Sequence, residues 1–170
     1  MATVPRARVP GNRDPVALTR PEVQALLGAA TDPFDYTFFA TMLATGLRIS
    51  EACVLRIEDI DRRAGLVHVR KGKGGKARAT MLSAKHLRLL ERYWIVVRPR
   101  KPWLFPAQRL AAPRVIDPVD RWADHPVSRK TMGGRLRGIV ADASLQRPVT
   151  SHHIRRTFAT WLHESGVDLR

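Results

Sequence analysis

A short polar segment in the first third of the chain combines an arginine with an acid in a pattern suited to binding an anion. Residues 45–51 read Thr-Gly-Leu-Arg-Ile-Ser-Glu, so Arg48 follows a glycine break in an apolar stretch and Glu51 comes three residues later. Residues three apart share one face of a helix, and the helix dipole favours anions, not an arginine, at a helix start. The pair therefore indicates either a poised anion site or an ordinary surface ion pair.

A second segment, near residue 150, places a histidine and an arginine at helical spacing. Residues 152–156 read His-His-Ile-Arg-Arg, which puts His152 and Arg155 on one face of a helix. Arginine can donate two parallel hydrogen bonds to phosphate oxygens, and histidine can give or take a proton near neutral pH. The segment lacks cysteine and carboxylate neighbours, which argues against a metal site. It predicts either phosphate chemistry or a basic helix that lies on a phosphate backbone without chemistry.

A third segment, residues 71–76, is rich in glycine and lysine and reads Lys-Gly-Lys-Gly-Gly-Lys. Glycine allows a backbone to approach a phosphate closely, and lysines supply point charges. The segment lacks the strand-loop-helix setting and the Lys-Ser/Thr ending of a P-loop, so nucleotide binding is not expected. The alternative is a solvated hairpin tip.

The hydrophobic pattern around these segments predicts a mostly helical α+β domain with a small antiparallel hairpin. The apolar stretch 36–44 is apolar all round, so it is expected in the core. Residues 66–70 and 78–82 have strand patterns on either side of the glycine-rich turn. Residues 98–118 are rich in proline and are expected to form a loop anchored by Trp103, Leu104 and Phe105. Further helices are expected at residues 20–30, 47–55, from Ser83 past Trp94, at 128–143 and at 151–165.

The composition points to a polyanionic partner. The chain has 170 residues, a net charge of +15 and a pI near 11.5, a surplus that favours nucleic acid, with a merely basic protein as the alternative. The single cysteine, Cys53, excludes a disulfide framework, and a cytoplasmic location is expected. The sequence has no apolar run long enough for a membrane span. Residues 1–17 are interpreted as a flexible basic arm, and residues 18–170 as one domain.

Taken together, and in their order along the chain, the three segments resemble those of the tyrosine recombinases, the phage integrase family. The Trp-Leu-Phe-Pro sequence at residues 103–106 also resembles a loop of that family, and the resemblance covers about residues 18–170. It implies the fold of that family's catalytic domain and site-specific recombination or integration of double-stranded DNA. In that family a tyrosine attacks a phosphodiester to form a 3′-phosphotyrosine, without metal or cofactor, and tetramers assemble on DNA.

The resemblance assigns roles to individual residues. The family's first arginine corresponds to Arg48, its supporting acid to Glu51, and its His-x-x-Arg pair to His152 and Arg155. Its general-acid lysine corresponds best to Lys73, with Lys71 and Lys76 as the alternatives. Further cations expected to contact DNA are Lys71, Lys76, Arg78 and Arg156.

Two departures from the family pattern affect the expected activity. Arg156 stands where the family often has a second histidine. Neither tyrosine, Tyr36 or Tyr93, lies in the nucleophile's context, because the family's tyrosine comes in helices after the His-x-x-Arg segment. The expectation is a catalytic domain truncated at its C-terminus and inactive alone. The alternatives are a non-catalytic module that binds duplex DNA and, less favoured, a basic RNA-binding protein.

Overall fold

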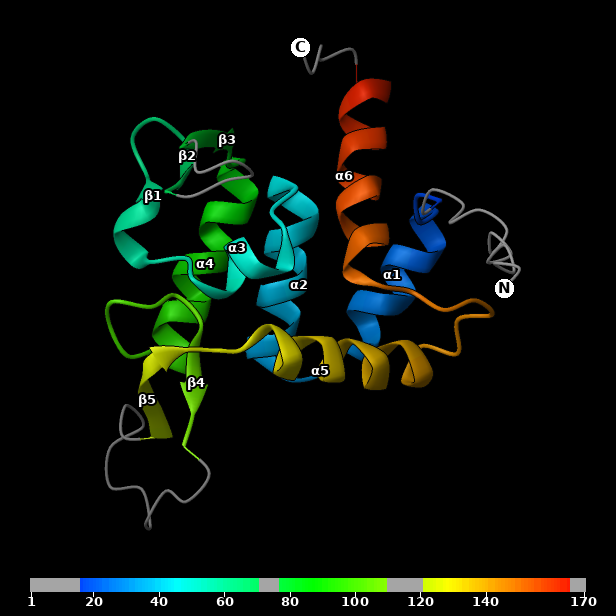
Figure 1. Ribbon diagram of the computed structural model, residues 1–170. Helices are drawn as coiled ribbons and strands as arrows, with labels where there is room; N and C mark the ends of the chain where they lie inside the picture. Colours follow the sequence, from blue (N-terminus) through cyan, green and yellow to red (C-terminus); the bar gives the residue numbers. More distant parts are fainter. Residues whose placement is uncertain (1–15, 71–76, 110–120, 166–170) are drawn as a thin grey trace, which may run out of the picture.

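The computed structural model describes residues 16–70, 77–109 and 121–165, and within them it confirms a mostly helical α+β fold (Figure 1). The expected arm at residues 1–17 falls almost wholly outside these ranges, as do Lys71, Lys73 and Lys76. The helices are α1 (Arg20–Ala29), α2 (Pro33–Thr45), α3 (Ile49–Cys53), a 3₁₀ turn (Ile57–Asp59), α4 (Ala84–Val97), α5 (Arg129–Asp142) and α6 (Ser151–Glu164). The strands are β1 (Ile60–Asp61), β2 (Leu66–Val69), β3 (Arg78–Met81), β4 (Pro106–Gln108) and β5 (Trp122–Pro126).

Side-chain caps set the starts of the helices, largely where the sequence predicts them. Thr19 and Glu22 form a reciprocal capping box at α1, with a proline in the first turn. The Asp32 carboxylate accepts a hydrogen bond from the backbone N–H of Phe34 and starts α2. Ser83 and Ser128 cap α4 and α5 in the same way.

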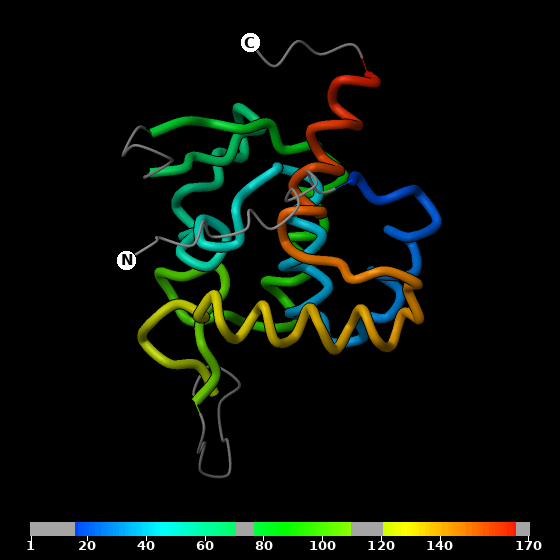
Figure 2. Tube along the Cα trace, turned by 45° about the vertical axis from the view of Figure 1, so that its right-hand side comes forward, coloured from blue at the N-terminus to red at the C-terminus, as the bar shows by residue number. Residues whose placement is uncertain are grey.

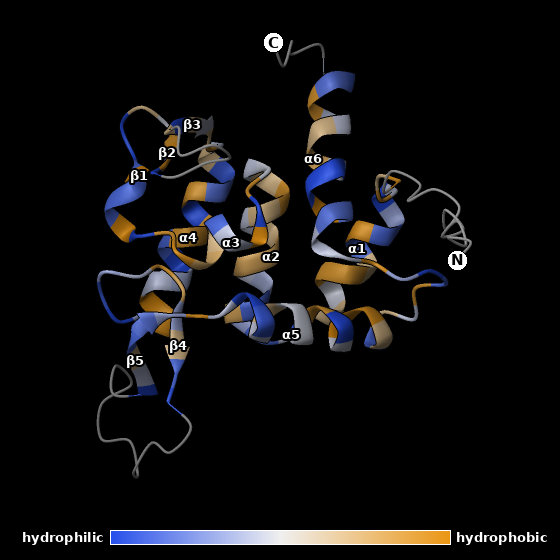
Figure 3. Cartoon of the chain, viewed as in Figure 1, coloured by the Kyte–Doolittle hydropathy of each residue, from blue (hydrophilic) through white to orange (hydrophobic). Residues whose placement is uncertain are grey.

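Helix α2 is the centre of the molecule, as its all-round apolar pattern predicts. It packs against α4 on one side and α6 on the other, while α5 contacts α1 and α3 (Figures 1 and 2). Phe38, Phe39 and Met42 have no exposed surface. Phe34 stacks on Trp122, which joins α2 to β5. In Figure 3, α6 differs from α2 in hydropathy, because α6 carries alternating hydrophilic and hydrophobic bands.

The predicted hairpin is present as part of a three-stranded antiparallel sheet in the order β1-β2-β3. Its register pairs Val69 with Arg78, next to the glycine-rich turn. Residues 98–118, expected to form a loop, contain β4, which pairs with β5. That expectation was wrong for residues 106–108, because a three-residue strand beginning at Pro106 has too short a pattern to detect.

The helix expected over residues 47–55 is shorter than predicted. Gly46 ends α2 with a left-handed backbone (φ 63°), and Arg48 is extended (φ −68°, ψ 151°), so α3 contains only Ile49–Cys53. The backbone N–H of Arg48 donates to the Glu51 carboxylate at 2.8 Å and makes no intrahelical bond. Arg48 is thus the N-cap residue of α3, and its side chain therefore lies outside the helix.

Candidate active site

The joint between α2 and α3 requires a glycine at position 46. A Cβ atom there would lie 2.2 Å from Cδ1 of Phe158 on α6, closer than real Cβ contacts allow. The left-handed backbone of Gly46 is also unfavourable for other residues. Helix α6 therefore packs directly on this joint, and the two segments that the sequence singles out meet here.

Glu51 is buried at this joint, with 7% of its surface exposed, and it accepts hydrogen bonds from two arginines. Its Oε1 accepts from Nη1 of Arg48 at 3.0 Å, and its Oε2 accepts from Nη2 of Arg78 at 2.6 Å. Nη1 of Arg155 lies 3.9 Å from Oε2. We call Arg48, Arg78 and Arg155 around Glu51 the arginine cluster.

Each member of the arginine cluster comes from a different element. Arg155 reaches it from α6, where its Nη1 donates to the carbonyl oxygen of Gly46 at 2.5 Å. Arg78 is the first residue of β3, and two residues further along that strand Thr80 donates its hydroxyl to the Thr45 carbonyl at 2.9 Å. The backbone joint that carries Arg48 thus also holds the other two arginines in place.

The electrostatics of the arginine cluster favour an anion. Burial lowers the pKa of Arg155, the charge of Arg48 lowers it further, Glu51 opposes the shift and Arg78 adds to it. The side chains of Arg48, Arg78 and Arg155 keep 36%, 33% and 36% of their surface exposed, whereas that of Glu51 keeps 6%. The three guanidinium groups share a buried acid and still face solvent, so they can donate to a phosphate and stabilise charge that develops on it.

The two histidines of α6 differ in their surroundings. His152 is exposed on the first turn, three residues before Arg155, where the helix dipole also favours an anion. His153 instead caps the helix, since its Nδ1 accepts a hydrogen bond from the backbone N–H of Thr150 at 3.1 Å. Burial lowers the pKa of His153, and the charge of Arg147 lowers it further. His152 is therefore the histidine available to a ligand, and Arg156 is exposed beside it.

Sequence reasoning found Arg48, Glu51 and Arg155 but placed Arg78 on the DNA-binding surface without linking it to Glu51. Its side chain reaches the arginine cluster only because of the strand register, which the local pattern leaves open. The buried residues of α6 are Ile154 and Thr157.

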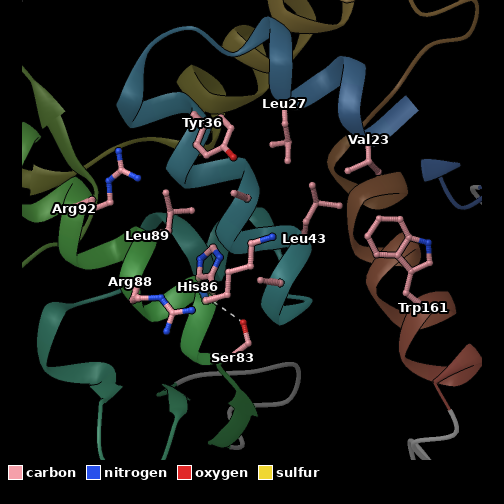
Figure 4. A pocket seen from close by; sticks show the side chains of 13 residues that line it. Val23, Leu27, Tyr36, Leu43, Ser83, His86, Arg88, Leu89, Arg92 and Trp161 are labelled. Carbon is pink, nitrogen blue, oxygen red and sulfur yellow. Dashed lines mark hydrogen bonds between the residues drawn. The ribbon is translucent and has the colours of Figure 1, made fainter. Parts of the chain in front are cut away.

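The two tyrosines lie away from the arginine cluster. Tyr93 is buried and donates its hydroxyl to the Leu104 carbonyl at 3.0 Å, and burial raises its pKa. Tyr36 lines an open groove between α1, α2, α4 and α6, together with Leu27, Leu43 and Trp161 (Figure 4). Neither the bond of Tyr93 nor the lining of the groove around Tyr36 includes a residue of the arginine cluster.

Other kinds of site find little support in the described part of the chain. Over residues 16–70, 77–109 and 121–165, no three His, Cys, Asp or Glu side chains gather as metal ligands. In the same residues, every helix is too short or too polar to span a bilayer. Cys53 is buried, and burial raises its pKa to about 12, so it is a packed residue and a poor nucleophile.

The comparison with known proteins identifies the family. The sequence profile described as "Phage integrase family" matches residues 17–170. This chain belongs to the phage integrase family. It is 40% identical over 156 residues to the Sinorhizobium fredii protein y4qK, which carries the name integrase/recombinase, covering 92% of this chain and 46% of that protein. It is 32% identical over 156 residues to the tyrosine recombinase XerA of Pyrococcus horikoshii, covering 92% and 50%.

Solved structures of recombinases share the fold of this chain. A crystal structure of XerA recombinase superimposes with a TM-score of 0.73 at 26% identity, covering 95% of this chain and 54% of that one. The site-specific recombinase XerH, solved bound to its difH substrate, has the same fold with a TM-score of 0.67 at 23% identity, covering 89% and 44%. This chain spans about half the length of the curated relatives it matches.

Proposed function

We propose that this chain is the DNA-binding catalytic domain of a site-specific tyrosine recombinase. The observation that carries the proposal is the arginine cluster, in which three guanidinium groups share one buried carboxylate. Membership of the phage integrase family supports the reaction class. Because the proposed substrate is chromosomal or mobile-element DNA, we place the protein in the cytoplasm. The DNA-bound XerH structure supports double-stranded DNA as the partner, and tetramers on DNA are proposed for the longer protein.

The proposed reaction exchanges one phosphorus–oxygen bond for another. A tyrosine oxygen bonds to phosphorus, the bond from phosphorus to the 5′-oxygen breaks, and the 5′-oxygen leaves with a proton. Arg48 and Arg155 would hold the phosphate oxygens and stabilise their developing charge. Lys73 would supply the proton to the leaving oxygen, and His152 would accept the proton that the attacking tyrosine loses. Lys71, Lys76 and Arg156 would contact the flanking backbone.

Neither Tyr36 nor Tyr93 is assigned the nucleophilic role. The buried hydroxyl of Tyr93 donates a hydrogen bond to the Leu104 carbonyl, and Tyr36 lines the groove shown in Figure 4. Strand cleavage is therefore expected to need a tyrosine beyond the 170 residues of this sequence. The second candidate function, a duplex-binding module without chemistry, rests on the same observation.

The first experiment measures binding of this chain to labelled duplex DNA over a series of salt concentrations. We expect the logarithm of the association constant to fall linearly with the logarithm of the salt concentration. The slope of this line should be about −0.9 for each phosphate that the protein neutralises. Substitution of both Arg48 and Arg155 by glutamine should make this slope less negative by about 2. The matched control replaces Arg62 and Arg100, which form exposed ion pairs with Glu91 and Asp124. Equal binding at low and high salt, or tighter binding of duplex RNA, would overturn the proposal.

The second experiment separates the catalytic domain from the binding module. The substrate is a duplex whose scissile phosphate carries p-nitrophenolate as its leaving group, with phenol added as the nucleophile. A catalytic domain accelerates release of p-nitrophenolate, and Arg48→Ala lowers the rate by on the order of 100-fold, the usual effect of losing one charge-stabilising donor. Salt-dependent binding without acceleration identifies the binding module. A covalent DNA adduct through Tyr36 or Tyr93 would contradict the assignment of the nucleophile.

A further inference from the structure

The charges around Glu51 are unbalanced, and this distinguishes the arginine cluster from another buried acid nearby. Asp59 is also buried and accepts a hydrogen bond from Nε of Arg70 at 2.6 Å. There, Glu58 lies beside it and pairs with both Arg56 and Arg70, so two acids meet two arginines. Around Glu51, three described arginines meet one acid. The group around Asp59 is therefore balanced in charge, whereas the arginine cluster has two arginines in surplus over its one acid.

Arg48 alone could satisfy Glu51. Its backbone N–H donates to Oε2 and its Nη1 to Oε1, so both carboxylate oxygens already have a donor, one of them charged. Arg78 adds a second donor to Oε2. A guanidinium group has five N–H donors, and this bond uses one of them. The remaining donors belong to a side chain that is one-third exposed, as are those of Arg48 and Arg155.

We propose that Arg78 is a third phosphate-contacting arginine of the site, held in position by Glu51. The inference rests on the proposed function, because it assumes that the arginine cluster receives a DNA phosphate. Two of the three equatorial oxygens of the pentacoordinate phosphorus are non-bridging and carry the negative charge. Each of them can accept more than one hydrogen bond, so Arg78 can donate to them beside Arg48 and Arg155. Arg78 then adds to the charge stabilisation that Arg48 and Arg155 provide.

The position of Arg78 is fixed well enough for such a role. Alternate residues of a strand point to the same face of a sheet, so Arg78 and Thr80 share a face. Thr80 is bonded to the Thr45 carbonyl, which pins that face of β3 to the end of α2. The pairing of Arg78 with Val69 holds the backbone from the other side. A side chain anchored in this way loses little further freedom on binding, which favours affinity.

The test compares variants of the whole chain in the salt series with duplex DNA. Arg78→Gln removes the charge, Arg78→Lys keeps it, and Arg70→Gln is the matched control, since it removes one charge from the same hairpin and breaks a bond to a buried acid. We expect Arg78→Gln to reduce the salt slope by about 0.9 and Arg78→Lys to restore it. Arg70→Gln should leave the slope unchanged. Urea unfolding of each variant separates loss of binding from loss of folding.

A direct measurement in the unsubstituted chain covers the case in which Arg78→Gln fails to fold. In nitrogen-15 spectra, the Nε–Hε resonances of Arg48, Arg78 and Arg155 should shift together as duplex DNA is added, while that of Arg70 stays in place. A normal salt slope in the unsubstituted chain, together with an unchanged slope in Arg78→Gln or an unmoved Arg78 resonance, would reject this inference and leave the proposed function intact. A flat slope in the unsubstituted chain would instead reject the proposed function.

Discussion

Replacement of Gly46 by alanine tests how closely α6 must approach the α2–α3 joint. The new Cβ would lie 2.2 Å and 2.6 Å from two ring atoms of Phe158. Overpacking of this kind costs about 1–3 kcal/mol, because the ring and its helix must move. The left-handed backbone at Gly46 adds about 1–2 kcal/mol. Since α6 carries Arg155, whose Nη1 donates to the Gly46 carbonyl, DNA binding should weaken together with stability.

Gly65 is a matched control for the backbone contribution. It has the same φ of 63°, but a Cβ there would meet only the Leu82 carbonyl oxygen, at 3.2 Å. Both substitutions lower the entropy of the unfolded chain equally. The free energy of unfolding of Gly46→Ala should therefore fall about 1–3 kcal/mol below that of Gly65→Ala. At this chain length each kcal/mol shifts Tm by roughly 2–4 °C, so thermal and urea unfolding both resolve the difference.

The double variant Gly46→Ala/Phe158→Ala identifies the clash itself. Once the ring is removed, alanine at position 46 should cost no more than alanine at position 65. Equal costs for Gly46→Ala and Gly65→Ala in the presence of Phe158 would refute the reasoning, since the ring contact would then impose no constraint on α6.

Two further predictions concern buried polar groups. His86 is buried beside the Thr41 hydroxyl, and burial lowers its pKa from 6.5 to about 4. Its neutral ring therefore contributes stability that is present above pH 6.5 and lost as the pH falls towards 4. Measured by urea unfolding, the free energy of unfolding should fall between pH 7.5 and pH 5 by about 2 kcal/mol more in the unsubstituted chain than in His86→Gln. An identical pH dependence of the two proteins would contradict this prediction. Thr157→Val removes the acceptor of the buried Leu18 N–H and should cost about 1–3 kcal/mol in the same assay, whereas Thr157→Ser should retain most of the stability; equal losses would argue against the hydrogen bond.

The parts of the site that sequence reasoning predicted are those that depend on local spacing. The pairing of Arg48 with Glu51 follows from three residues of separation. The core position of α2 follows from its apolar composition. Each of these needs only a few consecutive residues.

The features that escaped prediction depend on the register of distant segments. Arg78 reaches Glu51 across 27 positions, and the Thr80 hydroxyl reaches the Thr45 carbonyl across 35. The pair β4 and β5 is separated by residues that carry no hairpin signal, and its register contains an irregularity. Such contacts are decided by packing of the whole domain, which the local pattern does not encode.

The bond between Arg155 and the Gly46 carbonyl also has a consequence for how the domain folds. It joins residues 109 positions apart, and the nearby bonds from Arg147 to Glu22 and from Leu18 to Thr157 span 125 and 139 positions. Contacts of such high sequence separation form slowly, because a long loop must close first. During synthesis α6 leaves the ribosome after its partners, so the nascent chain carries its basic segments before it can assemble the arginine cluster. The proposed phosphate site is therefore assembled only in the completed fold, whereas the positive charge of the chain accumulates throughout synthesis.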